Sequence, residues 1–184
     1  MRGFSQVKGV DYYEIFASVN RLSSFRVLLA VATAKNMVLR HFDIEIAILY
    51  GHCDEEIYIQ PPNGVNIAEG NVLGLHKCFY GLKQAQSFWH YTASTALRKL
   101  GFEETDVEPC LFERAGADDT YMLMQMYVDK LAVAAMKQAA VDAVFQEFSA
   151  FFCQESWITG VVSRHQGRLQ SHARHLSHLA DCLY

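Results

Sequence analysis

The sequence predicts an α+β domain in which antiparallel strands carry helices packed on one face. Segments with strand-like alternation are interrupted, at uneven spacing, by segments with helical periodicity, and several strands follow one another through short connections. This order is typical of an antiparallel sheet covered by helices and not of a parallel βαβ repeat. The 184 residues suffice for one large domain or two small subdomains with a sizeable core.

The first half of the chain contains one predicted helix followed by predicted strands. Apolar residues recur at helical spacing from Asn20 to Ala34, and Asn36 then supplies a break. In the next segment apolar and polar residues alternate, as in a strand that ends near Asp43. Residues 46–50 then lead to a turn at Gly51-His52. The strands expected in this half are 37–44 and 56–60, which stops at a Pro-Pro-Asn-Gly cluster. A short, largely apolar run follows over 73–80 and ends at Gly81.

The second half contains two predicted helices and an antiparallel meander. The helix over 83–100 is expected to end at Gly101, a residue suited to a helix C-terminus, and a further helix is expected over 139–152. The strands expected here are 111–112, 121–128, 131–135 and 157–162. A polar, His-rich tail follows, without a predicted element.

Composition restricts the class of protein. Hydrophobic residues at 51% and charged residues at 20% exclude wholesale disorder. The net charge of −4 argues against affinity based on broad phosphate neutralisation, although a local basic surface remains compatible with it. Five widely spaced cysteines, without a C-x-x-C pair, favour reduced thiols in an intracellular compartment. With no long apolar run, we expect neither secretion nor membrane contact.

Asp43 and Asp129 are the residues whose chemistry is most specific. Each follows an apolar strand at a turn, and Tyr127-Val-Asp129 joins two apolar strands directly. Carboxylates brought together from separate strands can hold Mg²⁺, and two such ions support phosphoryl transfer. The alternative is that each aspartate is a solvated turn residue.

Other candidate residues have simpler explanations. Lys83-Gln84, at the start of a predicted helix, suits either a phosphate or a solvated first turn. Cys53, Cys78 and Cys110 lack an activating partner in sequence and are expected to be buried apolar residues. The histidines of the tail have no accompanying metal signature and are expected to form a solvated face; they are His165, His172, His175 and His178.

Ordered matches along most of the chain resemble the reverse-transcriptase domain of copia-type LTR retrotransposons. His41-Phe-Asp43 to Gly51 resembles Q-x-D-V-x-x-A-F-L-x-G, and Tyr127-Val-Asp129 resembles the Y-V-D-D turn. Phe79 to Ala85, with Trp89, resembles Y-G-L-K-Q-x-P-R-x-W. The further matching segments are residues 2–6, 9–16, 24–32, 54–62, 146–148 and 158–160.

The resemblance implies a fingers-and-palm fold and RNA-directed DNA polymerisation. Residues 1–36 and 52–82 would be fingers-like, and 37–51 and 83–184 palm-like, with the thumb and RNase H regions absent. It implies RNA or DNA primer–template and deoxynucleoside triphosphates as partners, and an intracellular location in cytoplasm, particles or nucleus.

The resemblance also implies a site. Asp43 and Asp129 would be catalytic and hold two Mg²⁺ ions, with Ile44 contributing its carbonyl. The residues implied on the nucleotide and template side are Arg26, Ile48, Tyr80, Gly81, Lys83 and Gln84.

Departures from the family pattern indicate an impaired copy. Lys130 stands where the family has the second aspartate, which reverses a charge at the metal site. Ile48 stands where the family has the phenylalanine that screens the sugar 2′ position, and Gln86-Ser87 replace Pro-Arg. We therefore expect a degenerate reverse transcriptase; the alternatives are a non-catalytic nucleic-acid-binding remnant and a pseudogene product without activity.

Overall fold

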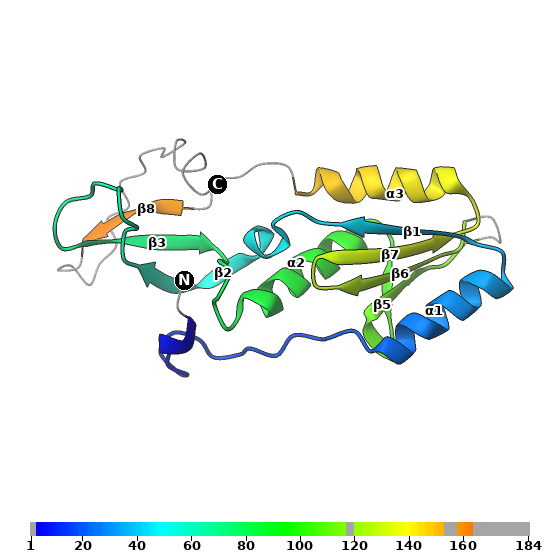
Figure 1. Ribbon diagram of the computed structural model, residues 1–184, viewed down its shortest axis with the longest axis horizontal. Coiled ribbons are helices and arrows are strands. Elements are labelled where there is room, and N and C mark those ends of the chain that lie inside the picture. Colours follow the sequence, from blue (N-terminus) through cyan, green and yellow to red (C-terminus); the bar gives the residue numbers. More distant parts are fainter. Residues whose placement is uncertain (1–2, 117–119, 153–157, 164–184) are drawn as a thin grey trace.

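The computed structural model describes residues 3–116, 120–152 and 158–163 (Figure 1). The helices of this part are η1 (Gly3–Ser5), α1 (Leu22–Ala34), η2 (Ala47–Tyr50), α2 (Ala85–Lys99) and α3 (Gln138–Ala150). Its strands are β1 (Val38–Asp43), β2 (His52–Ile59), β3 (Asn71–Lys77), β4 (Glu103–Thr105), β5 (Glu108–Arg114), β6 (Met122–Tyr127), β7 (Lys130–Ala135) and β8 (Ile158–Ser163). Every strand pair is antiparallel, so the predicted mixed α and β class is confirmed.

A five-stranded sheet in the order β1-β7-β6-β5-β4 forms the main body. β6 and β7 form a hairpin, and β1 lies on its open edge, paired from Val38↔Ala135 to Asp43↔Lys130. Residues 122–126 of β6 are all buried, because both faces of the sheet are covered at this strand. The lack of apolar–polar alternation in β6, where Gln125 is the one polar residue among 122–126, is explained by this two-sided burial.

The two faces of this sheet bury alternate residues of β6 against different helices. Met122, Met124 and Met126 pack with α2 and α3, in one core that includes Trp89 and Val144. The expectation of helices on one face is therefore correct for α2 and α3.

α1 departs from that expectation and covers the opposite face. Its Leu28 and Ala32 pack with Leu123 of β6 and Ala134 of β7, and Figure 1 shows α1 and α3 on opposite sides of the sheet. Leu123 is buried at 6% exposure, so this face needs a cover as well.

The second sheet has three strands, in the order β2-β3-β8. β8 is 81 residues beyond the end of β3 in sequence (158 − 77 = 81) and pairs with it from Asn71↔Ser163. β8 lies within the span predicted as palm-like, yet it pairs with β3 from the fingers-like span; the division into fingers and palm stays a prediction.

α2 ends as the sequence predicts. Gly101 has a φ of +81°, and its N–H donates to the carbonyl of Arg98 while that of Phe102 donates to the carbonyl of Leu97. These two bonds form a Schellman cap, which favours glycine at the left-handed position. None of the helices in the described residues has the length and apolar character needed to cross a membrane.

Candidate active site at the end of the five-stranded sheet

Asp43 and Asp129 come together at one end of the sheet, as the sequence predicts. Asp43 is the last residue of β1 and lies opposite Lys130 at the start of β7. The N–H of Ile44 donates to the carbonyl of Asp129 over 2.7 Å, which joins the end of β1 to the β6–β7 turn. Strand pairing alone therefore places two carboxylates, 86 residues apart in the chain (129 − 43 = 86), at a single site.

The turn that carries Asp129 has an unusual backbone. Tyr127 and Lys130 form the last pair of the hairpin, with Val128 and Asp129 between them. Val128 has a φ of +52°, a left-handed conformation that costs energy for a β-branched residue. The indole Nε1–H of Trp89, a side chain with 1% exposure, donates to the Val128 carbonyl over 2.6 Å. This hydrogen bond from the buried indole of α2 stabilises the strained turn.

Lys130 places its ammonium beside both carboxylates. Its Nζ donates to Oδ1 of Asp43 over 3.1 Å and lies 4.0 Å from Oδ1 of Asp129. The hydrogen bond to Asp43 raises the pKa of Lys130, and the nearby charge of Asp129 raises it further, so the ammonium is retained at neutral pH.

The donor set at the turn does not fit the two Mg²⁺ ions of the family. Mg²⁺ needs oxygen ligands, and here two carboxylates face an ammonium instead of a third carboxylate. Within residues 3–116, 120–152 and 158–163, no group of three or more His, Cys, Asp or Glu side chains could hold a metal ion.

Tyr80 and Ile48 lie next to this site. Burial raises the pKa of the Tyr80 hydroxyl, a hydrogen bond with the backbone of Ile48 lowers it, and the charges of Asp129 and Asp43 raise it. Tyr80 is thus within electrostatic reach of both carboxylates, and its side chain is half exposed. Ile48 itself is buried in the core with 7% exposure. Its predicted part in sugar selection stays a prediction.

Gln84 makes contacts that the sequence did not suggest. It is fully buried, and its Nε2 donates to the carbonyl of Asp11 at 2.9 Å and to Oε2 of Glu55 at 2.6 Å. Its Oε1 accepts a hydrogen bond from Nε2 of Gln6 at 3.0 Å. The side chain thus fastens the N-terminal segment to β2, and it precedes α2 without entering its first turn.

Lys83 also contacts the N-terminal segment. Its Nζ donates to the carbonyl of Gln6 over 3.1 Å and lies 5.0 Å from the ring centre of Tyr12. Gly81, with a φ of +94°, forms the turn that precedes these residues. The roles of Gly81, Lys83 and Gln84 toward nucleotide or template stay predictions.

Arg26 lies on the exposed side of α1, away from the core that α1 shares with the sheet. In the described part of the chain its guanidinium has neither an ion pair nor a hydrogen bond. Its predicted approach to a triphosphate stays a prediction. The tail histidines, from His165 to His178, lie outside the described residues.

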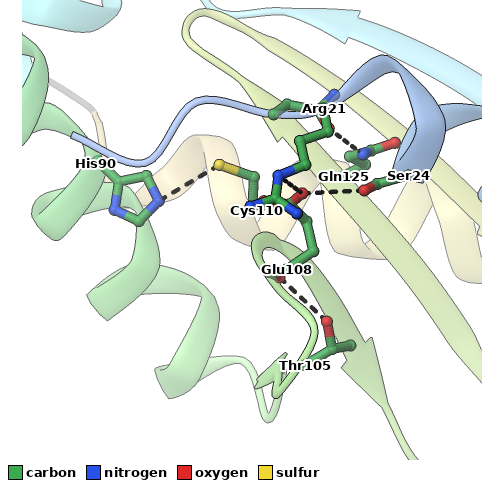
Figure 2. Close-up of polar contacts among 8 residues, drawn as sticks. Arg21, Ser24, His90, Thr105, Glu108, Cys110 and Gln125 are labelled. Carbon is green, nitrogen blue, oxygen red and sulfur yellow. Dashed lines mark hydrogen bonds and ion pairs between the residues drawn. The ribbon is translucent and has the colours of Figure 1, made fainter.

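A second polar cluster, around Glu108, was not predicted at all (Figure 2). The Glu108 side chain is buried at 4% exposure, accepts a hydrogen bond from Ser24 Oγ at 2.9 Å, and lies 3.9 Å from Arg21 Nε. Thr105 Oγ1 donates to the Glu108 carbonyl at 3.1 Å. Because Ser24 is in the first turn of α1, the buried carboxylate fixes that helix end. No sequence motif signals this contact, which spans 84 residues.

Cys110 lies beside His90, with Sγ 3.9 Å from Nε2, in the same view. Burial lowers the pKa of His90, so the ring is mainly neutral near pH 7 and does not activate the thiol. Burial, reinforced by the charges of Glu108 and Glu104, raises the pKa of Cys110 to about 12. Cys78 and Cys110 are buried, and Cys53 is partly buried. The expected burial is therefore correct for the first two and only partial for Cys53.

Cys110 is expected to resist alkylation in the folded chain. A pKa near 12, against an ordinary 9.0, lowers the thiolate fraction at pH 8 roughly a thousandfold, and only the thiolate reacts. The measurement is the rate of iodoacetamide labelling of the Cys110 peptide by mass spectrometry. The same peptide in urea-unfolded chain is the control and should label fast; equal rates in both states would contradict the burial.

Comparisons with known proteins identify the family of this chain. A family model described as reverse transcriptase (RNA-dependent DNA polymerase) matches residues 1–167. The chain belongs to this reverse transcriptase family. It is 28% identical over 154 residues to the retrovirus-related Pol polyprotein from transposon TNT 1-94 of Nicotiana tabacum, which covers 83% of the chain and 12% of the relative. The resemblance noted in the sequence is thereby confirmed.

Two further relatives of this reverse transcriptase domain are transposon polyproteins. One is the retrovirus-related Pol polyprotein from transposon RE2 of Arabidopsis thaliana, 34% identical over 80% of the chain and 10% of the relative. The other is the transposon Ty1-MR1 Gag-Pol polyprotein of Saccharomyces cerevisiae, 31% identical over 57% of the chain and 6% of the relative. The chain thus spans about a tenth of the length of the plant relatives. No solved structure matches it.

Proposed function

We propose that this chain is the fingers-and-palm part of a retrotransposon reverse transcriptase whose polymerase activity is impaired by Lys130. The observation that carries the proposal is the contact of the Lys130 ammonium with Asp43, at 3.1 Å, beside Asp129. The carboxylates that would serve catalysis are brought together, but their charge is balanced from within the chain. A metal ion has to displace this ammonium before it can use either carboxylate.

The surroundings of the turn support the assignment to a polymerase site. The charges of both carboxylates act on the Tyr80 hydroxyl, and the Trp89 hydrogen bond holds the turn that presents Asp129. A primer–template and a deoxynucleoside triphosphate are the substrates that such a site serves in the family. We propose that Tyr80 and Lys83 contact the nucleotide and the template. Both side chains can be reached from solvent, since Tyr80 is half exposed and Lys83 is exposed.

The same contact favours nucleic-acid binding without catalysis as a second function. Asp43 and Asp129 with Lys130 carry a net charge of −1 (−1 − 1 + 1), whereas three aspartates would carry −3. Phosphate groups are therefore repelled less by this turn in the absence of a metal ion.

The test is one preparation of the chain, assayed for primer–template binding and for primer extension. We expect salt-dependent binding in EDTA, with an affinity about tenfold above that of Lys130→Asp at low ionic strength, since the variant adds negative charge beside phosphates. No extension is expected with Mg²⁺ or Mn²⁺.

Lys8→Asp is the matched control, because it makes the same change in charge within the exposed N-terminal segment. Extension by the unaltered chain would overturn the impairment. A lack of primer–template binding even at low salt would contradict the nucleic-acid-binding function and would indicate a chain without activity.

A further inference from the structure

A cavity of about 460 Å³ lies on the α1 side of the five-stranded sheet. Its walls are mainly apolar, with Val19, Leu22 and Phe25 on one side and Ala132 of β7 on the other. This volume falls within the range of cavities that bind small molecules, and the apolar walls suit a flat hydrocarbon surface.

Gln125 is the buried polar group of this cavity. It has 2% exposure, lines the cavity from β6, and its Nε2 donates to Oδ1 of Asn20. Its Oε1 is the one buried side-chain nitrogen or oxygen atom in the described part of the chain that lacks a hydrogen-bond partner. A buried acceptor without a donor destabilises the folded chain. A ligand that donates an N–H to Gln125 Oε1 removes this unfavourable free energy, which favours binding. The terminal amide torsion is soft, so rotation of the amide can present Oε1 to a ligand in the cavity.

The rim of the cavity determines the charge of its ligand. Lys130 and His41 line it beside Tyr127. The ammonium of Lys130 is paired with Asp43 over 3.1 Å, so this ion pair attracts neither a cation nor an anion strongly. An uncharged ligand is therefore favoured over either ion.

We infer that this cavity binds a small, uncharged, planar nitrogen heterocycle whose ring N–H donates to Gln125. The apolar walls pack on the faces of the ring, and Gln125 Oε1 accepts a hydrogen bond from the ring N–H. Nucleobases and free heteroaromatic compounds share this chemistry. The inference rests on the cavity and on Gln125, and it is independent of the proposed polymerase function.

Indole and 1-methylindole are the probes, because they share shape and charge and differ in the N–H. We expect indole to bind the full chain with a dissociation constant of roughly a millimolar, as its few atoms allow. 1-Methylindole should bind about five- to tenfold more weakly, since it cannot satisfy the acceptor. Binding is followed by NMR shifts of the backbone amides of Gln125, Tyr127 and Ala132. Adenine and uracil, titrated in the same way, distinguish nucleobases from other heterocycles.

Two variants complete the test. Ala132→Phe fills the cavity and should abolish binding of both probes, whereas Gln125→Met keeps the volume and should make their affinities equal. Equal affinities of the two probes for the unaltered chain would overturn the role of Gln125, whether or not the variants fold. Shifts confined to other residues, or none up to the solubility of indole, would overturn the site itself.

Discussion

Lys130→Asp is expected to raise the affinity of the chain for Mg²⁺ on the order of 100-fold. The variant removes the ammonium that contacts Asp43 at 3.1 Å and adds a carboxylate at the same position of β7. The repulsion of a divalent ion then disappears, and a third ligand oxygen becomes available. Because all three side chains are partly exposed, at 43% to 60%, water screens part of this effect.

Isothermal titration of the folded chain with Mg²⁺ measures this change. Lys130→Ala separates the two contributions, since it removes the cation without adding a ligand and should give an intermediate affinity. Lys8→Asp controls for the change in net charge and should leave the affinity unchanged. If Lys130→Asp bound Mg²⁺ no better than Lys8→Asp, the shared site of Asp43 and Asp129 would be wrong.

Trp89→Ala is expected to lower the free energy of unfolding by about 3–5 kcal/mol. Trp89 has 1% exposure and lies in the core that joins α2 to β6 and β7. Trp89→Phe keeps an aromatic ring but removes the Nε1–H that donates to the carbonyl of the partly buried Val128, and the loss of this hydrogen bond is expected to cost about 1 kcal/mol. The strained turn at Val128 should then loosen.

Urea unfolding followed by far-UV circular dichroism gives the free energies. Tyr91→Ala is the matched control, because Tyr91 is in the same helix but has 67% exposure, and a change within about 0.5 kcal/mol is expected. A specific effect on the turn is tested in the Lys130→Asp background. There Trp89→Phe should weaken Mg²⁺ binding at temperatures where the chain remains folded. An unchanged Mg²⁺ affinity would show that Trp89 stabilises the core without positioning the turn.

Local patterns predicted most of the elements, because each depends on near neighbours. The periodicity of α1, α2 and α3 and the glycine at the end of α2 correspond to observed helices and to a Schellman cap. β4 was missed because Glu103-Glu104-Thr105 has no apolar alternation; it is a strand by virtue of its pairing with β5. β2 begins four residues earlier than expected (56 − 52 = 4), because pairing with β3 extends to His52↔Lys77.

The sequence by itself determined the family, the positions of Asp43 and Asp129, and the replacement of an acidic residue by Lys130, because these are properties of ordered residues along the chain. Only the tertiary structure decided that α1 covers the opposite face of the sheet, that Trp89 holds the turn, and where the Lys130 ammonium rests. The reason is physical: a residue's strand register and the side chains opposite it arise from contacts between segments that are distant in sequence. At the Tyr127-Val-Asp129 turn, that register places the lysine's charge against the aspartate of β1.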